Sequence, residues 1–234
     1  MVALSHHLNL DEDQTHEAGM AGLLPDLGKA LIQSDVLLKP GKLTPEEFDI
    51  MKSHPAQGYL LLLEGGVARE ISLDVVLHHH ERIDGSGYPD KLKEDEISLY
   101  EKMGAVFDVY DAITSNRPNK VGWGPAESIQ RMSEWCAAQY GGDVFQAFVS
   151  SVGIYPVGSL IRLASGRLGV VIEQTKSLVA PKVKVFFSTK SKSYIPIEII
   201  DLSRASVDCN GLKILAHEDL SKWNFKEDNK MWMN

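Results

Sequence analysis

One stretch of this 234-residue chain decides how it is interpreted: His78-His79-His80-Glu81-Arg82-Ile83-Asp84-Gly85-Ser86-Gly87-Tyr88-Pro89. Three consecutive histidines at the end of a helical run are unusual, because histidine is a poor helix former. Neighbouring helical residues are about 100° apart in projection, so two of the imidazoles can face one cavity while the third faces away. Imidazoles combined with carboxylates suit a divalent transition metal such as iron, manganese, nickel or zinc.

Histidines also have a more ordinary explanation. A single buried imidazole is more often satisfied by a backbone carbonyl than by a metal. We interpret His6, His7, His16 and His217 as structural or solvated residues of that kind. The run of three is harder to explain in this way. The residues alone therefore leave a metal site and a set of structural histidines as alternatives.

Two acidic motifs and a further histidine could complete a metal site. Asp26 lies in Leu24-Pro25-Asp26-Leu27-Gly28-Lys29, Asp108 follows Val106-Phe107, and His54 precedes Pro55. If a helix continues through the first motif, Asp26 and Lys29 share one face at the spacing i, i+3. A metal-bound carboxylate beside a cation suits phosphodiester hydrolysis, because the metal activates a water and the lysine neutralises phosphate oxygens.

Composition narrows the possible partners. Lys and Arg number 24 against 32 Asp and Glu, so the formal charge is −8. A chain that repels anions overall is a poor DNA-binding protein, although a local basic pocket could hold a small anion. Cys136 and Cys209 form no CxxC motif, which argues against a disulfide framework. We find no signal-peptide pattern and no apolar run near the ~20 residues of a membrane span, so we expect a cytoplasmic protein.

The patterning predicts a mainly α fold. A helical domain, residues 1–154, is expected to precede a small antiparallel β region and tail, residues 155–234. Helical periodicity and end signals predict helices within residues 15–27, 44–64, 67–80, 98–115, 125–140 and 143–152. Thr44 before Pro45 is typical of a helix start, and Gly65-Gly66 of a helix end.

Burial is expected to follow the apolar residues of these segments. In the second predicted helix, Phe48, Ile50, Met51 and the run 59–63 are expected to be buried.

The remaining chain is predicted to form strands and a tail. β-branched runs separated by Gly and Ser predict strands within residues 157–173 and 181–200. Arg162, Lys182 and Lys184 alternate with apolar neighbours, which favours half-exposed antiparallel strands. The polar segment 218–234 is expected to be a loosely tethered tail.

The quoted stretch resembles the signature of the HD-GYP family. That family hydrolyses the bacterial second messenger cyclic di-GMP on a helical HD-type domain with a two- or three-metal centre. Flanking segments resemble the family in the expected order: residues 37–48, His54-Pro55, residues 105–115 and Arg117-Pro118. The similarity covers about residues 4–150, and it implies an HD-type fold, a divalent metal and cyclic di-GMP as ligand.

The resemblance also implies roles for individual residues. The implied metal ligands are Asp26, His54, His79, His80 and Asp108. The implied catalytic residues are Asp26 and Lys29, and the implied nucleotide contacts are Lys29, Gly87, Tyr88, Arg117 and Lys120. Gly87, Tyr88 and Pro89 would also dock partner proteins, including diguanylate cyclase (GGDEF) domains. Two ordinary alternatives remain, a surface turn over residues 85–89 and a solvated loop lysine at position 120.

One departure from the family pattern concerns the metal directly. The family is named for an adjacent His-Asp pair, and here Pro25 stands in place of that histidine, before Asp26. Proline offers no side-chain donor or acceptor to a metal. The family's earlier metal-binding histidine also has no counterpart in this chain. By resemblance, one metal position retains only Asp26 and Asp108, whereas the other retains Asp26, His54, His79 and His80.

We therefore expect at most one tightly held divalent ion, at the three-histidine position. Losing one of two metals would lower the rate by several powers of ten, since each ~1.36 kcal/mol is a factor of ten. The expected function is cyclic di-GMP signalling with weak or lost phosphodiesterase activity, through nucleotide or partner binding. The alternative is an active phosphodiesterase with a reduced metal centre that produces pGpG or GMP. A third interpretation is that the chain is a fragment whose missing ligand lies outside it.

Overall fold

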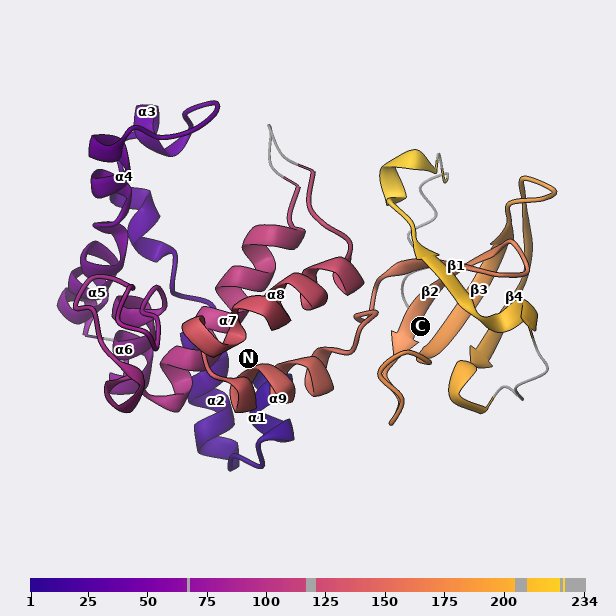
Figure 1. The fold of residues 1–234 in the computed structure, drawn as a ribbon, viewed down its shortest axis with the longest axis horizontal. Coiled ribbons are helices and arrows are strands. Elements are labelled where there is room, and N and C mark those ends of the chain that lie inside the picture. The colour runs from indigo at the N-terminus through magenta and orange to yellow at the C-terminus, as the bar shows by residue number, and fades with distance from the viewer. Residues whose placement is uncertain (67, 117–120, 205–209, 224, 226–234) are drawn as a thin grey trace. The chain divides into compact units, whose positions relative to one another are not determined.

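The computed structural model describes residues 1–66, 68–116, 121–204, 210–223 and 225. It divides into a helical unit, Met1–Trp123 with Glu127–Ser151, and a sheet unit, Gly124–Ala126 with Val152–Asn234. The prediction of a mainly helical region followed by a small antiparallel β region is confirmed (Figure 1). Among the described residues, no helix is both long enough and apolar enough to cross a bilayer.

The helical region contains nine α-helices among the described residues. They are α1 Val2–His7, α2 Glu12–Ala21, α3 Ser34–Leu37, α4 Pro45–Met51, α5 His54–Gly65, α6 Glu70–His78, α7 Leu99–Thr114, α8 Pro125–Gln139 and α9 Gly142–Val152. Two short 3-10 helices, η1 Leu27–Leu31 and η2 Glu94–Glu96, lie between them.

Local signals place several helix ends. Thr44 caps α4 and Ser98 caps α7, each in a capping box with the residue three positions later. Gly66 ends α5 in the left-handed conformation, which glycine adopts without steric cost. The predicted start of α4 and end of α5 are thereby confirmed.

The predicted helix over residues 15–27 is wrong at both ends. It begins at Glu12, capped by Asp11, and ends at Ala21. The chain then turns through Pro25 into η1, because proline lacks the N–H that continues a helix. The helix predicted over 67–80 begins only at Glu70 and ends at His78.

The predicted burial in the second helical segment is largely wrong. Phe48 is 48% exposed, and Ile50 and Leu60 are also exposed. Two helices, α4 and α5, replace the single segment, and α5 buries His54, Pro55, Gly58 and Leu62. This spacing of about four residues marks one buried helix face, so the other apolar residues point away from it.

The sheet unit is a five-stranded antiparallel sheet with strand order β4-β3-β2-β1-β5. The strands are β1 Leu160–Leu163, β2 Arg167–Glu173, β3 Lys182–Ser188, β4 Ser193–Asp201 and β5 Ile214–His217. β1, β2 and β3 fall within the predicted ranges, β4 extends one residue past them to Asp201, and β5 was not predicted. β5 pairs with β1 and forms one edge of the sheet.

Both faces of the central strands are buried. Val171 and Val183 belong to one apolar cluster, and Leu168 and Phe186 belong to another. The predicted half-exposure of Lys184 is therefore wrong, since this residue is only 6% exposed. Strands covered on both faces do not show the alternation of a half-exposed strand.

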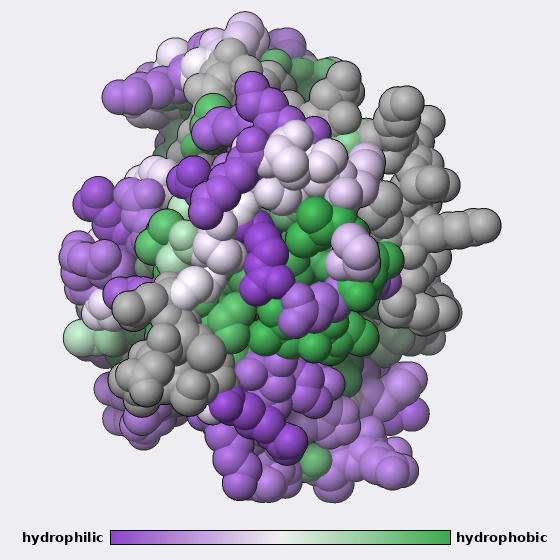
Figure 2. All heavy atoms as spheres, turned by 90° about the vertical axis from the view of Figure 1, so that its right-hand side faces the viewer, coloured by the Kyte–Doolittle hydropathy of each residue, from purple (hydrophilic) through white to green (hydrophobic). Residues whose placement is uncertain are grey.

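The start of the C-terminal segment is packed rather than loose. Trp223 and Phe225 lie against the Phe186 cluster, and the Phe186 and Phe225 ring centroids are 5.3 Å apart. The rest of the predicted tail, residues 226–234, lies outside the described residues. Apolar side chains also remain at the surface of the sheet unit (Figure 2), and Ile197 and Ile199 of β4 are among the exposed ones.

Candidate metal centre

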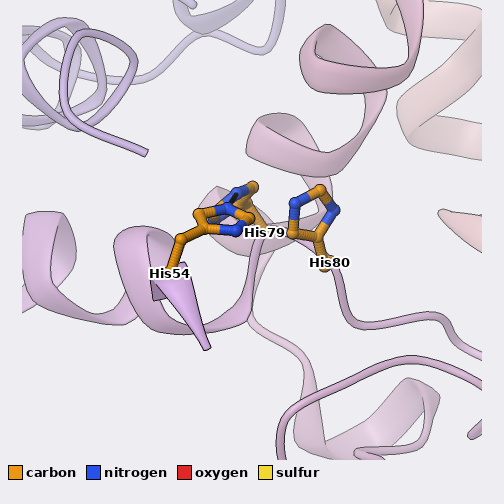
Figure 3. A group of neighbouring side chains, drawn as sticks. All are labelled: His54, His79 and His80. Carbon is orange, nitrogen blue, oxygen red and sulfur yellow. Dashed lines mark hydrogen bonds between the residues drawn. The ribbon is translucent and has the colours of Figure 1, made fainter. Parts of the chain in front are cut away.

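Three histidines of the helical unit converge on one point. His54 is the first residue of α5, while His79 caps the C-terminus of α6 and His80 follows it. One ring nitrogen of each lies within 4.8 Å of the others (Figure 3). His78 faces away, with Nδ1 2.5 Å from Glu101 Oε1. Two of the three consecutive histidines thus share a cavity, as the helical geometry predicts.

Backbone carbonyls orient two of the rings. His54 Nδ1 donates to the Met51 carbonyl at 2.8 Å, and His79 Nδ1 donates to the Val76 carbonyl at 2.9 Å. Each Nε2 is then left with a free lone pair, and the two Nε2 atoms are 3.3 Å apart. Metal-binding histidines commonly have this arrangement, in which the outer nitrogen donates to the backbone.

His80 supplies a further test of whether a metal fits. Its Nε2 is buried and has no hydrogen-bond partner among the described residues. A buried polar atom without a partner is costly, and binding of an ion is one recognised explanation. His80 Nε2 and the facing Nε2 atoms of His54 and His79 form a set of nitrogen donors that suits a divalent transition metal.

Two carboxylates border the histidines. Asp26 Oδ1 lies 3.6 Å from His54 Nε2 and 3.9 Å from His79 Nε2. Asp108 Oδ2 lies 3.5 Å from His80 Nδ1. Lys29 Nζ is 2.7 Å from Asp26 Oδ1, so a cation stands directly beside the carboxylate. The structure therefore brings these six residues into one neighbourhood.

The histidines are held neutral. Burial is the main cause that lowers the pKa of His54, and it lowers the pKa of His79 to about 4 and of His80 to about 2. The neighbouring imidazoles lower the last two further, since adjacent like charges are unfavourable. Neutral imidazole is the form that binds metal.

Gly28 allows the Asp26 segment to approach the histidines, and our sequence reasoning gave it no role. A Cβ at this position would lie 1.9 Å from the His54 carbonyl oxygen and 2.6 Å from the Gly58 nitrogen. Only glycine permits such close contact between η1 and α5. The available signal was the glycine between Asp26 and Lys29, but spacing alone does not show a backbone contact.

Two cavities are lined by the histidines or by the carboxylates beside them. The larger, of about 440 Å³, is lined by side chains that include His79, His80, Tyr88 and Asp108. The other, of about 350 Å³, is lined by residues that include Pro25, Asp26 and Asp108. Pro25 therefore lies at the wall of the second cavity, where its side chain offers a metal no donor atom.

The signature loop, residues 81–92, contributes several of the residues that line the larger cavity. The Tyr88 ring stacks on His80 with centroids 4.8 Å apart, whereas Pro89 is exposed. Gly87 is buried, and a Cβ there would lie 2.4 Å from the Arg82 nitrogen. Close backbone packing thus explains why position 87 is a glycine, and no contact with a ligand is needed to explain it. Arg117 and Lys120, the other expected nucleotide contacts, lie outside the described residues.

Glu81 is a loop residue to which our sequence reasoning gave no role. Its carboxylate is buried and accepts hydrogen bonds from the backbone N–H groups of Asp90, Lys91 and Leu92. The signal was its place within the signature, but its partners lie nine to eleven residues away. They become apparent only when the loop is folded.

Comparison with known proteins identifies the family. A family model described as an HD domain matches residues 2–144. The chain is 51% identical over 233 residues to the cyclic di-GMP phosphodiesterase PA4108 of Pseudomonas aeruginosa, covering 99% of this chain and 55% of that protein. It is 47% identical over 122 residues to the cyclic di-GMP phosphodiesterase response regulator RpfG of Xanthomonas campestris, covering 51% of this chain and 32% of that one.

A third relative is more distant. The chain is 37% identical over 147 residues to a cyclic di-GMP phosphodiesterase of Thermotoga maritima, covering 62% of this chain and 40% of that protein. This chain belongs to the HD domain family. It spans only about half the length, or less, of these relatives.

Proposed function

We propose that this chain is a metal-dependent phosphodiesterase of the HD-GYP type that hydrolyses cyclic di-GMP to pGpG or GMP. The observation that carries the proposal is the three histidine nitrogens within 4.8 Å of one another. They lie in the segment that matches the HD domain family, and the three relatives described above, each named a cyclic di-GMP phosphodiesterase, are 37% to 51% identical to this chain.

The expectation of weak or lost activity finds no support in these relatives. The similarity to PA4108 extends over 99% of the chain, and that protein is named as a phosphodiesterase. The comparisons therefore favour the alternative, an active enzyme with a reduced metal centre. Pro25 remains the reason to expect fewer bound metal ions in this centre.

We assign one divalent ion, iron, manganese, nickel or zinc, to His54, His79, His80 and Asp26. When bound, such an ion supplies Lewis acidity and an acidified water as nucleophile. Lys29, 2.7 Å from Asp26, neutralises charge that develops on the phosphate oxygens. Asp108, near His80, borders both cavities. A second ion would have Asp26 and Asp108 as ligands, and two carboxylates form a weak site.

The nucleotide would occupy the larger cavity. Tyr88, stacked on His80, presents an aromatic wall there. Gly87 would shape that wall through its close packing, and Arg117 and Lys120 are further proposed contacts. Pro89 is the exposed member of the Gly-Tyr-Pro group, so docking of a diguanylate cyclase domain would rely mainly on it.

Turnover tests this function. The chain is incubated with cyclic di-GMP and Mn²⁺ or Fe²⁺, and the linear dinucleotide and GMP are separated by chromatography. We expect product formation that a chelator abolishes and that His54→Ala lowers at least about 100-fold. His16→Ala, at an exposed position, is the matched control and should retain full activity. Absence of product with every metal would contradict the proposal.

A further inference from the structure

Lys91, at the end of the signature loop, has an unusual backbone. Its φ is +59°, in the left-handed region. Side chains with a Cβ rarely adopt this region, and glycine and asparagine adopt it at the lowest cost. Non-glycine residues held in this region are concentrated at active sites and ligand clamps. A lysine at such a position therefore needs an explanation.

Glu81 holds this backbone in place. The carboxylate, only 2% exposed, accepts from Asp90 N at 2.6 Å, Lys91 N at 3.0 Å and Leu92 N at 3.1 Å. Three charge-assisted hydrogen bonds from consecutive residues over-determine the turn. They offset the cost of the left-handed conformation and fix where the lysine side chain starts.

Lys91 lines the larger cavity, together with His79, His80 and Tyr88. Lys52 lines the same cavity, but its Nζ lies 2.6 Å from Asp49 Oδ1. Within the part of the chain that the structure describes, no carboxylate lies within 4.0 Å of the Lys91 ammonium. Lys91 therefore offers the cavity a positive charge that no described acidic side chain neutralises.

We infer that Lys91 is a binding residue for a phosphate of the cyclic dinucleotide, positioned by the Glu81 carboxylate. The inference rests on the proposed function and adds a contact outside the motifs that suggested it. A phosphodiester carries one negative charge, and this chain carries a formal charge of −8. A local cation is then needed to draw the anion to the cavity.

The effect of the Lys91 charge can be distinguished from an effect on folding by substitutions that preserve the backbone conformation. Lys91→Asn removes the charge while retaining a residue that tolerates φ near +60°. Lys91→Arg retains the charge. Lys192 has φ +52° and does not line the cavity, so Lys192→Asn is a matched control for the backbone effect.

The measurement is the Kd of the full chain for a phosphorothioate analogue of cyclic di-GMP that resists hydrolysis, by titration calorimetry. We expect Lys91→Asn to weaken binding about tenfold or more, as loss of a charge-assisted contact does. Lys91→Arg and Lys192→Asn should bind within about twofold of the wild type. The Tm of Lys91→Asn should be no lower than that of the wild type, since the strain is relieved.

Each other outcome has a distinct meaning. If the wild type binds and Lys91→Asn binds equally well, the inference fails while the proposed function stands. If Lys91→Arg loses as much affinity as Lys91→Asn, the charge is not responsible and the inference fails. If the wild type does not bind the analogue and does not hydrolyse cyclic di-GMP, the proposed function fails, and the inference fails with it.

Discussion

The direction of the ring nitrogens is the decisive feature at the residue scale. His54 is oriented by the carbonyl of Met51 at the end of α4, three residues earlier, and His79 is oriented by the carbonyl of Val76 in α6. The orientation of these Nε2 atoms therefore does not depend on a bound ion. Such preorganisation favours tight binding, because little order remains to be imposed when the metal enters.

A substitution at Pro25 tests whether the missing ligand limits metal binding and activity. Pro25→His would add a nitrogen donor at the wall of the cavity that Asp26 and Asp108 also line. We expect a rise in metal per chain, in cyclic di-GMP turnover, or in both. Elemental analysis and product chromatography measure the two. No change in either would show that position 25 does not limit the centre.

Gly28 tests the backbone contact that brings Asp26 to the histidines. In Gly28→Ala the new Cβ would lie 1.9 Å from the His54 carbonyl oxygen, so η1 must move. We expect a loss of about 1–3 kcal/mol in the free energy of unfolding, together with weaker metal binding.

Urea denaturation measures the stability of this variant. Gly142→Ala is the control, because a Cβ there meets no atom within 4 Å. Equal stability of both variants would argue against the close contact.

At the element scale, Glu81 joins the beginning of the signature loop to its end. In Glu81→Gln the neutral amide weakens the charge-assisted hydrogen bonds to Asp90, Lys91 and Leu92, and one acceptor oxygen is lost. We expect KM for cyclic di-GMP to rise more than kcat falls, because the loop lines the cavity without holding the metal.

A matched variant controls for the loss of an acidic side chain in this loop region. Glu96 accepts from Lys93 N at 2.9 Å at the exposed start of η2. Glu96→Gln should leave KM unchanged. A kcat loss without any change in KM for Glu81→Gln would contradict the positioning role.

The elements also show what could be predicted from the sequence. The Thr44 and Ser98 helix starts and the Gly66 stop depend on residues a few positions apart, so pattern reasoning finds them. The exposure of Phe48 and the burial of Lys184 depend on which elements pack above them. That information is tertiary, and it overrides hydropathy.

In the candidate site, too, some features could be predicted from the sequence and others depend on tertiary contacts. The grouping of His54, His79 and His80 could be predicted, since resemblance to a family carries the three-dimensional arrangement with it. The contributions of Gly28 and Glu81 could not, because a backbone approach and a hydrogen bond nine residues away leave no local pattern.

For the whole molecule, metal binding and folding are linked. An ion that binds only the folded chain stabilises it, by about 2.7 kcal/mol at a hundredfold excess over Kd. For a chain of this size that is a Tm shift of roughly 5–10 °C. We expect a chelator to lower the Tm of the metal-loaded wild type by this order, as followed by circular dichroism. An unchanged Tm would contradict the linkage.

The most direct test of the central claim is the number of metal ions per chain, measured by plasma mass spectrometry after purification without chelators. If one site is formed by His54, His79, His80 and Asp26, we expect about one ion of iron, manganese, nickel or zinc per chain. The same number is expected in the wild type and in His16→Gln. We expect almost no bound metal in His79→Gln, and circular dichroism should confirm that this variant is folded. Undiminished metal in folded His79→Gln would contradict the assignment.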